Sequence, residues 1–241
     1  MKDYKYIATT HSTNALLKDM LRGEALPEFF VVRTAFQTAG KGQMGNSWES
    51  ERSKNLLFSM LLRPHHIFIQ DQFVLSQLVS VGLIRALAHV GVDARVKWPN
   101  DIYVGDKKIA GILIENSLRN ARIDTSVVGV GLNVNQIQFV SDAPNPISIK
   151  MLVSKTISVR KLLKSFREEF ESIYPVTDLT LLKQTYMKFL YRSTGVFRYK
   201  LPAGMEFNAS IEDVCQDGQL ILKSDKNEIT SYYFKEIEFV L

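Results

Sequence analysis

The sequence predicts an α+β protein, with a larger domain of helices and strands followed by a small unit made of β-strands alone. Hydrophobic residues make up 46% and charged residues 23% of the 241 residues, which is the balance of a soluble globular protein with a sizeable core. Helical and extended patterns follow one another as far as Arg192. Beyond it the chain consists of short strands separated by turns. The predicted domains are therefore 1–191 and 192–241.

Periodicity and capping signals define the first elements. Apolar residues at helical spacing predict helices over 13–22, with Ser12 or Thr13 as the cap, and over 71–90. Runs of β-branched and aromatic residues predict strands over 29–33 and 56–62. The glycine-rich stretch between these two strands is therefore predicted to be a strand-to-strand loop.

The middle of the chain predicts a β-hairpin and then more helices. Two extended runs, 95–104 and 107–115, are joined by Gly105-Asp106, a dipeptide that suits a tight turn. The remaining predicted elements are a strand over 127–134, a proline-containing loop over 142–146, helices over 158–174 and 178–190, and strands over 195–200, 206–214, 218–223 and 229–239.

Charge and composition exclude some classes of protein. The formal net charge of +5 and a pI near 9.2 suggest acidic partners, such as nucleic acid, phosphorylated small molecules or an acidic protein. No apolar run approaches the ~18 to 20 residues that cross a bilayer, and the N-terminus lacks the apolar core of a signal peptide, so we expect a cytoplasmic protein without membrane contact. The single cysteine, Cys215, cannot form an intramolecular disulfide, and the four histidines have no zinc-site spacing.

The first informative motif is the glycine-rich segment 37–48. Its glycines expose backbone N–H groups, and Lys41 adds a positive charge, which together suit a phosphate or carboxylate. The spacing fits neither a Walker loop nor a dinucleotide-binding fingerprint. A flexible loop without a ligand is the alternative, but Trp48 is available to stack on a base and favours the binding interpretation.

The second motif is the pentad Lys-Trp-Pro-Asn-Asp, followed by a strand that begins Lys-Lys-Ile-Ala-Gly. Because proline halts a strand, Asn100 and Asp101 are expected to face a cleft, where Asp101 can ligate magnesium. A hairpin returns Lys108 towards the same cleft, and Gly111 leaves room for a ligand. Taken separately, Asp101 is typical of a turn and Lys108 of a solvated strand edge. Their occurrence in one hairpin favours a functional site.

The third motif, Gly-x-Gly-x-Asn-Val-Asn over 129–135, is weak in isolation. In this order, however, the motifs resemble those of the biotin protein ligase family. The match comprises the Ser12-Thr13-Asn14 triplet, the Gly-Lys-Gly loop with its trailing Trp48, the pentad with its Lys-Ile-Ala-Gly-Ile-Leu strand, and the glycine–asparagine motif. It runs in detail from about residue 9 to 135. The resemblance implies a class II synthetase-like catalytic domain with a mixed β-sheet and flanking helices, followed by a small C-terminal SH3-like β-barrel.

The resemblance also implies an activity. Such an ATP-dependent, AMP-forming ligase uses MgATP to convert biotin into biotinyl-5′-AMP, and then transfers biotin to a lysine of a biotin carboxyl carrier domain. The expected partner is therefore acetyl-CoA carboxylase or a related biotin-dependent carboxylase. A homodimer is compatible with the family. Only eleven residues precede Ser12, so we expect no DNA-binding domain, no nucleic-acid partner and no repressor activity.

The resemblance implies a role for individual residues as well. Lys108 and Lys41 would be catalytic, with Lys108 holding the biotin carboxylate and later the acyl-phosphate oxygens. Trp48 would pack on adenine, Asn100 and Asn133 would bind the nucleotide, and Asp101 would bind Mg²⁺. The implied biotin-binding residues are Ser12, Thr13, Asn14, Gln37, Gly40, Lys41, Gly42, Gln43, Lys108 and Gly111.

Two departures and two alternatives accompany this interpretation. Gln43 and Asn46 stand where many family members carry arginine, so the loop has fewer cations to hold the adenylate. Lipoate or octanoate attachment shares the fold, but would be expected to show an arginine-rich glycine loop, which is absent. A basic nucleic-acid-binding protein is the other alternative, and residues 197–200, Phe-Arg-Tyr-Lys, are the one segment that interleaves aromatic and basic residues in the required manner.

Overall fold

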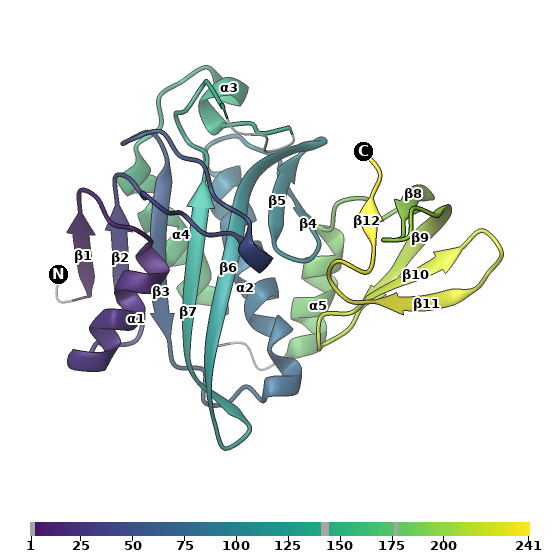
Figure 1. Ribbon diagram of the computed structural model, residues 1–241, viewed down its shortest axis with the longest axis horizontal. Helices are drawn as coiled ribbons and strands as arrows, with labels where there is room; N and C mark the ends of the chain where they lie inside the picture. The colour runs from purple at the N-terminus through teal and green to yellow at the C-terminus, as the bar shows by residue number, and fades with distance from the viewer. Residues whose placement is uncertain (1–2, 141–144, 176–177) are drawn as a thin grey trace.

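The computed structural model describes residues 3–140, 145–175 and 178–241, which form two β-sheets with helices packed on the larger one (Figure 1). The helices are α1 (Thr13–Gly23), α2 (Phe73–Ala88), α3 (Ile149–Val153), α4 (Val159–Ile173) and α5 (Leu179–Lys188). The strands of the larger sheet are β1 (Tyr4–Ile7), β2 (Val31–Thr34), β3 (Leu56–Leu62), β4 (Arg95–Lys97), β5 (Asp101–Val104), β6 (Lys107–Arg119) and β7 (Arg122–Leu132). Those of the smaller sheet are β8 (Phe197–Lys200), β9 (Glu206–Val214), β10 (Leu220–Ser224), β11 (Ile229–Tyr232) and β12 (Glu238–Phe239).

The larger sheet is mixed, as predicted. Its strand order is β1-β2-β3-β7-β6-β5-β4, with β1 parallel to β2 and the other neighbours antiparallel. The long β6–β7 hairpin lies at its centre (Figure 1). Every residue of β3 is buried, which explains its continuous apolar run.

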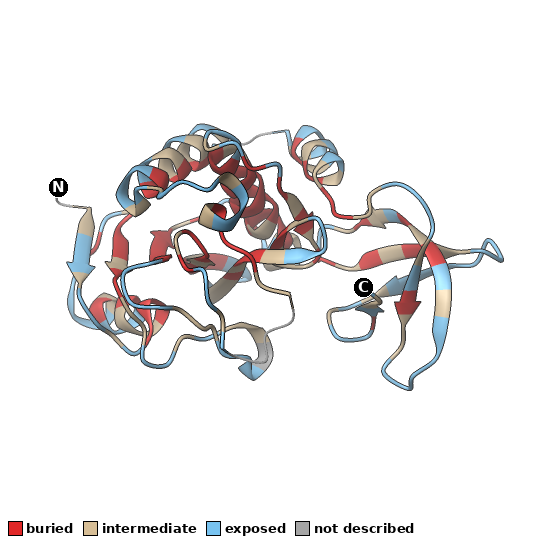
Figure 2. Ribbon diagram, turned by 90° about the horizontal axis from the view of Figure 1, so that it is seen from above, coloured by how far each residue is buried: buried red, intermediate tan, exposed pale blue. Residues whose placement is uncertain are grey.

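Helices cover both faces of this sheet. α1 lies on one face, and α2 and α4 lie on the other (Figures 1 and 2). The expectation that no apolar run approaches the length of a membrane span was wrong for Ile69–Ala88, which is long and apolar enough by length and composition, but most of this stretch is buried inside the fold. It is the central core helix, and α4 packs on it through Phe166 and Phe170. Gly82 permits this approach, because a Cβ there would lie 3.3 Å from the Phe170 backbone.

The smaller sheet is antiparallel, with the order β11-β10-β9-β8-β12, and agrees with the SH3-like unit that the resemblance implies. It attaches to the larger domain at Trp98, whose indole Nε1 donates a hydrogen bond of 2.8 Å to the carbonyl of Gly218. The Trp98 ring also meets Phe234 edge-on, with 6.4 Å between the centroids. The exact division of the chain at residues 191 and 192 stays a prediction.

Several predicted boundaries were wrong. The run 95–104 is two strands, because β4 and β5 turn back and pair with each other, and the strand expected over 127–134 begins at Arg122. The run 229–239 divides into β11 and β12, since β12 pairs with β8 on the other side of the sheet. Ser12 occupies the N-cap position of α1, but its side chain makes no capping hydrogen bond. Part of the predicted loop over 142–146 lies outside the described residues.

Candidate functional site

A cavity of about 370 Å³ opens where the start of α1, the glycine-rich loop and the centre of the larger sheet meet the C-terminal segment. Its volume lies in the usual range for small-molecule sites, about 300 to 1,000 Å³. The cavity brings together most of the residues that the sequence marks as functional. Those that line it are Ser12, Thr13, Asn14, Gln37, Lys41, Gly42, Gln43, Trp48, Asn100, Asp101, Lys108 and Gly111.

Two predicted ligand-binding residues, Gly40 and Asn133, are not among the lining residues. A Cβ on Gly40 would lie 2.7 Å from the carbonyl oxygen of Trp48, so glycine is needed there for the loop to pack on itself. Asn133 is buried, and its backbone N–H donates to the carbonyl of Ile109 at 2.9 Å. The ligand roles of both residues stay predictions.

The glycine-rich loop connects β2 to β3 and folds into a small flap. The N–H of Gly42 donates to the carbonyl of Asn46 at 2.7 Å, and the N–H of Trp48 donates to the carbonyl of Gly40 at 3.0 Å. A single 3-10 turn, Gln43–Gly45, forms the tip of the flap, and Gly45 has a φ of 87°, which is favourable for glycine. No α-helix follows the loop, so the arrangement is neither a Walker loop nor a dinucleotide fold.

Trp48 lies against two glycines that are register partners on the central strands, Gly111 on β6 and Gly131 on β7. A Cβ would lie 3.0 Å from the indole at Gly111 and 2.4 Å from it at Gly131. Any side chain at these positions would therefore displace the ring. The buried indole Nε1 has no hydrogen-bond partner among the described residues, so a ligand that accepts a hydrogen bond would satisfy it.

Lys108 and Asp101 meet as the predicted hairpin requires. The ammonium of Lys108 lies 2.7 Å from Oδ1 of Asp101, and the two side chains are 30% and 21% exposed. The same ammonium lies 5.7 Å from the centroid of the Trp48 ring. An anion that enters the cavity would therefore meet a partly buried cation beside an aromatic face.

Lys97 is a third cation in the cavity, and the sequence did not assign it a role. Its ammonium lies 3.2 Å from the hydroxyl of Tyr103 and 5.4 Å from the centroid of the Phe239 ring. Burial lowers its pKa from the ordinary value, as does the charge of Lys108, while Asp101 acts in the opposite direction. One feature of the sequence could have indicated a role for Lys97: it is the first residue of the Lys-Trp-Pro-Asn-Asp pentad. In the sheet β5 lies between its strand, β4, and the strand of Lys108, β6.

The other end of the cavity is lined by uncharged polar side chains at the start of α1. Asn14 lies over Gly129, where a Cβ would be 2.3 Å from the amide oxygen. The side chain of Gln37 accepts hydrogen bonds from the backbone N–H of Thr13 at 2.8 Å and from its hydroxyl at 3.1 Å. Gly129, which contacts Asn14, lies two residues before Gly131, which contacts Trp48, on β7. The polar end of the cavity is therefore separate from the end where Trp48 and Lys108 lie.

The smaller sheet completes the cavity through Phe234, Ile237, Glu238 and Phe239. These residues were missed because no local pattern shows that β12 returns to β4 and β5. No group of three or more His, Cys, Asp or Glu side chains that could hold a metal ion occurs in residues 3–140, 145–175 and 178–241. Asp101 is the only residue for which the sequence predicted metal binding, and in the structure its carboxylate is paired with the ammonium of Lys108.

Comparison with solved structures defines the class of the fold. The biotin protein ligase of Aquifex aeolicus in complex with biotin and ATP aligns with a TM-score of 0.80 at 20% identity, and the alignment covers 99% of this chain and 98% of that one. The architecture is thus that of a biotin protein ligase catalytic domain with its C-terminal β unit.

The chain belongs to the biotin/lipoate A/B protein ligase family, whose model matches residues 6–133. The bifunctional ligase/repressor BirA of Bacillus spizizenii is 37% identical over 111 residues, which are 46% of this chain and 34% of the relative. The biotin–[acetyl-CoA-carboxylase] ligase of Mycobacterium tuberculosis is 31% identical over 134 residues, which are 54% and 48% of the two chains. The matches thus span a third to a half of the length of these relatives.

Proposed function

We propose that this protein is a biotin protein ligase, which activates biotin with ATP and transfers it to a lysine of a biotin carboxyl carrier domain. The carrier belongs to an acetyl-CoA carboxylase or a related biotin-dependent carboxylase. Membership of the family and the named activity of the mycobacterial relative support the proposal. The nature of the cavity supports it independently of these comparisons.

The observation that carries the proposal is the division of one cavity into a neutral polar end and a cationic end. Ser12, Thr13 and Gln37 line the first, where a cyclic urea can exchange hydrogen bonds. Lys97 and Lys108, which lie on either side of Asp101, line the second, where a carboxylate and a polyphosphate need positive charge, and Lys41 lines the same cavity from the flap. Biotin, which has a urea ring at one end and a carboxylate at the other, matches this division.

In the first step a carboxylate oxygen of biotin attacks the α-phosphorus of ATP. A P–O bond forms, the bond to the β-phosphate oxygen breaks, and pyrophosphate leaves with that electron pair. Two anions approach each other in this step, so preorganised cations lower its barrier. In this proposal Lys108 contacts the carboxylate, and Lys41 on the flap contacts the phosphate.

In the second step the amine of the acceptor lysine attacks the acyl carbon of biotinyl-5′-AMP. An amide bond forms, AMP leaves with the electron pair of the C–O bond, and the amine loses a proton. The mixed anhydride must be protected from water until the acceptor arrives. The flap and the C-terminal segment both line the cavity and would provide that protection.

Magnesium would accompany ATP. Mg²⁺ in nucleotide sites is commonly held by one or two carboxylates together with substrate phosphates, and Asp101 fits the part of such a carboxylate. In the present arrangement Asp101 neutralises Lys108, so binding of the metal would free that ammonium for the anionic substrate. Bound magnesium would neutralise part of the phosphate charge.

Biotin-dependent exchange of labelled pyrophosphate into ATP tests the proposal. Purified protein should catalyse exchange with biotin and not with lipoate, and should then label a carrier domain. Exchange with lipoate alone would identify a lipoate ligase instead. A nucleic-acid-binding role has little support, because Tyr199 in the segment 197–200 is fully buried and Arg198 is paired with Glu206 at 3.3 Å.

A further inference from the structure

The ammonium of Lys97 lies between two aromatic side chains, one from each sheet. It is 4.8 Å from the centroid of the Tyr103 ring on β5 and 5.4 Å from that of the Phe239 ring on β12. Both distances fall within the range of about 6 Å in which the face of an aromatic ring attracts a cation. The hydroxyl of Tyr103 also accepts a hydrogen bond of 3.2 Å from this ammonium. A cation that lines the cavity is therefore held by the larger and the smaller sheet together.

Tyr103 is fixed within the larger sheet. It is only 2% exposed, and its strand has a neighbour on each side, because Tyr103 is the register partner of Arg95 on β4 and of Lys108 on β6. The ring of Tyr191 packs on it with 5.6 Å between the centroids. Tyr103 thus supplies a ring of fixed position on one side of the Lys97 ammonium.

Phe239 is fixed in a similar way by the smaller sheet. Its strand, β12, pairs with β8, where Phe239 is the register partner of Tyr199. The two rings meet edge-on with 5.1 Å between their centroids, and Tyr199 is fully buried. The Phe239 ring also lies 6.2 Å from the ring of Tyr191, measured between centroids. Phe239 thus supplies the second ring, and the position of this ring depends on the smaller sheet. We name the rings of Tyr103 and Phe239 the aromatic clamp.

The aromatic clamp holds a cation without neutralising it. The ammonium of Lys108 has the carboxylate of Asp101 at 2.7 Å, whereas within the described part of the chain the ammonium of Lys97 contacts the two rings and the Tyr103 hydroxyl. An anionic ligand must displace a carboxylate partner before it can use the charge, but it need not displace a neutral ring. Rings that fix a long side chain in advance also lower the entropic cost of placing its charge on a ligand. Lys97 is therefore preorganised and still available to an anion.

We infer that Phe239 is a positioning residue, which acts through Lys97 by holding its ammonium towards the polyphosphate of ATP. The smaller sheet thereby takes part in the first chemical step, because Phe239 reaches the cavity from β12. Both Phe239 and Lys97 line the cavity, as this role requires. The inference rests on the proposed function, since ATP is the anion that Lys97 meets in it.

Fluorinated phenylalanines at position 239 test the inference with almost no change of shape. Each fluorine withdraws electron density from the ring face and weakens its attraction for a cation, while the ring stays apolar. Full-length protein with phenylalanine or its mono-, di- or trifluorinated form at this position is assayed by biotin-dependent exchange of labelled pyrophosphate into ATP. We expect the logarithm of kcat/KM for ATP to fall with each fluorine, and kcat/KM to lie about 5- to 20-fold below wild type with the trifluorinated ring. The KM for biotin should stay within about twofold of wild type.

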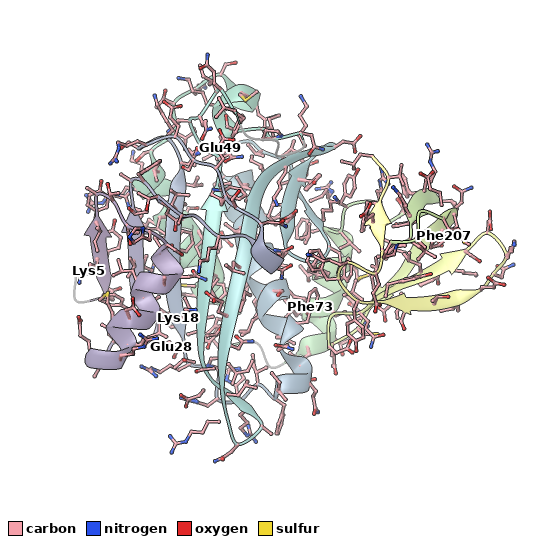
Figure 3. All side chains as sticks on the ribbon, viewed as in Figure 1. Lys5, Lys18, Glu28, Glu49, Phe73 and Phe207 are labelled. Carbon is pink, nitrogen blue, oxygen red and sulfur yellow. The ribbon has the colours of Figure 1, made fainter. Side chains whose placement is uncertain are left out.

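Encoded variants add a control and show whether Phe239 acts through Lys97. Phe239→Leu keeps an apolar side chain but removes the ring, and should lower kcat/KM for ATP by about 5- to 20-fold, whereas Phe239→Tyr should retain most of it. In a Lys97→Met background Phe239→Leu should have almost no further effect, because the two residues act as one unit. The matched control is Phe207→Leu, which should leave kcat/KM unchanged. Phe207, on the smaller sheet in Figure 3, also packs on Tyr199, with 6.2 Å between the centroids, but is not among the residues that line the cavity.

The outcomes separate this inference from the proposed function. If the trifluorinated ring keeps the wild-type kcat/KM for ATP, Phe239 serves only in packing and the inference is overturned, while exchange by wild type still supports the proposed function. An effect of Phe239→Leu that is equally large in wild type and in the Lys97→Met background also overturns it. If wild type catalyses no exchange with biotin, the proposed function fails and the inference fails with it. The fluorine series decides the question even where exchange by Lys97→Met is too slow to measure, and urea titrations distinguish lost positioning from lost stability.

Discussion

The indole of Trp48 lies so close to Gly131 that a Cβ on this glycine would fall 2.4 Å from the ring. Gly131→Ala should therefore push Trp48 and its flap away from the sheet. Overpacking of this kind costs about 1 to 3 kcal/mol of stability, and the free energy of unfolding from urea titrations will measure it. Biotin-dependent exchange should fall as well.

The matched control for this substitution is Gly23→Ala. Gly23 is the last residue of α1 and has no atom within 4 Å of its Cβ position. It should leave exchange unchanged and stability within about 1 kcal/mol of wild type. Equal effects of the two substitutions would show that close packing of Trp48 on Gly131 has no special importance.

Lys108→Ala should slow adenylation by about 10- to 100-fold, because it removes a charged contact of about 1.5 to 3 kcal/mol in a partly buried site. It also leaves Asp101 without the ammonium that lies 2.7 Å from it. Lys108→Arg should restore only part of the rate, since a planar guanidinium cannot replace a compact ammonium. Initial rates of pyrophosphate exchange measure both. The neighbouring exposed Lys107→Ala is the control, and wild-type exchange by Lys108→Ala would move the catalytic role to Lys41.

The flap should become ordered over bound ligands and should then resist proteolysis. Its glycines make an ordered empty conformation entropically costly, and the exposed Lys41 gains partners when an adenylate is bound. Limited proteolysis near residues 40–47 should accordingly be suppressed by biotin with ATP. Cleavage elsewhere serves as the internal reference. The same cleavage rate with and without ligands would argue against closure of the flap.

The sequence was informative where a motif is local and less so where the fold joins distant segments. The pentad and the strand after it lie in one hairpin, so the meeting of Asp101 with Lys108 could be predicted. The contact of Phe239 with Lys97 could not, because the return of β12 to the larger sheet leaves no local pattern. The same applies to the ion pair of Lys18 with Glu115.

Short elements were missed for a different reason. β1 has four residues, is largely polar on its exposed face, and is held by parallel pairing with β2, so neither length nor alternation marks it. α3 has five residues and depends on Ser148, whose hydroxyl accepts from the N–H of Met151. Both are stabilised by tertiary context, whereas α2 and β3 carry their apolar signal in their own sequences.

Glu115 should contribute to stability in a manner that depends on pH. Burial raises the pKa of Glu115. Hydrogen bonds from Lys18 and Asn14, together with the charges of Lys18 and Lys41, lower it by more than burial raises it, so the net pKa lies below the ordinary value. A depressed pKa means that the contribution is fully present above the unfolded value, about 4.3, and is lost as pH falls through the folded value. The stability difference between wild type and Glu115→Gln should thus be constant from about pH 7 to 5 and shrink below about pH 4. Urea titrations across this range measure it, and a difference that grows on acidification would contradict the assignment.

Gln43 occupies a place in the flap where an arginine would hold the activated acyl group more tightly. Gln43 lines the cavity, and its amide oxygen is buried and has no hydrogen-bond partner within the described part of the chain. Glutamine can donate a hydrogen bond to a phosphate but carries no charge, whereas a guanidinium can bind the phosphate in two places and help to exclude water. Gln43→Arg should therefore slow the release of biotinyl-5′-AMP, because the arginine adds one charged hydrogen bond to the phosphate. The dwell time of the intermediate should rise about 10- to 100-fold. Single-turnover release from wild type and from the variant measures this directly.

The competing interpretation is that Lys41 already neutralises the phosphate and that Gln43 only packs in the loop, in which case the release rate will not change. An unchanged or faster release from Gln43→Arg would therefore show that the missing arginine does not weaken retention of the intermediate.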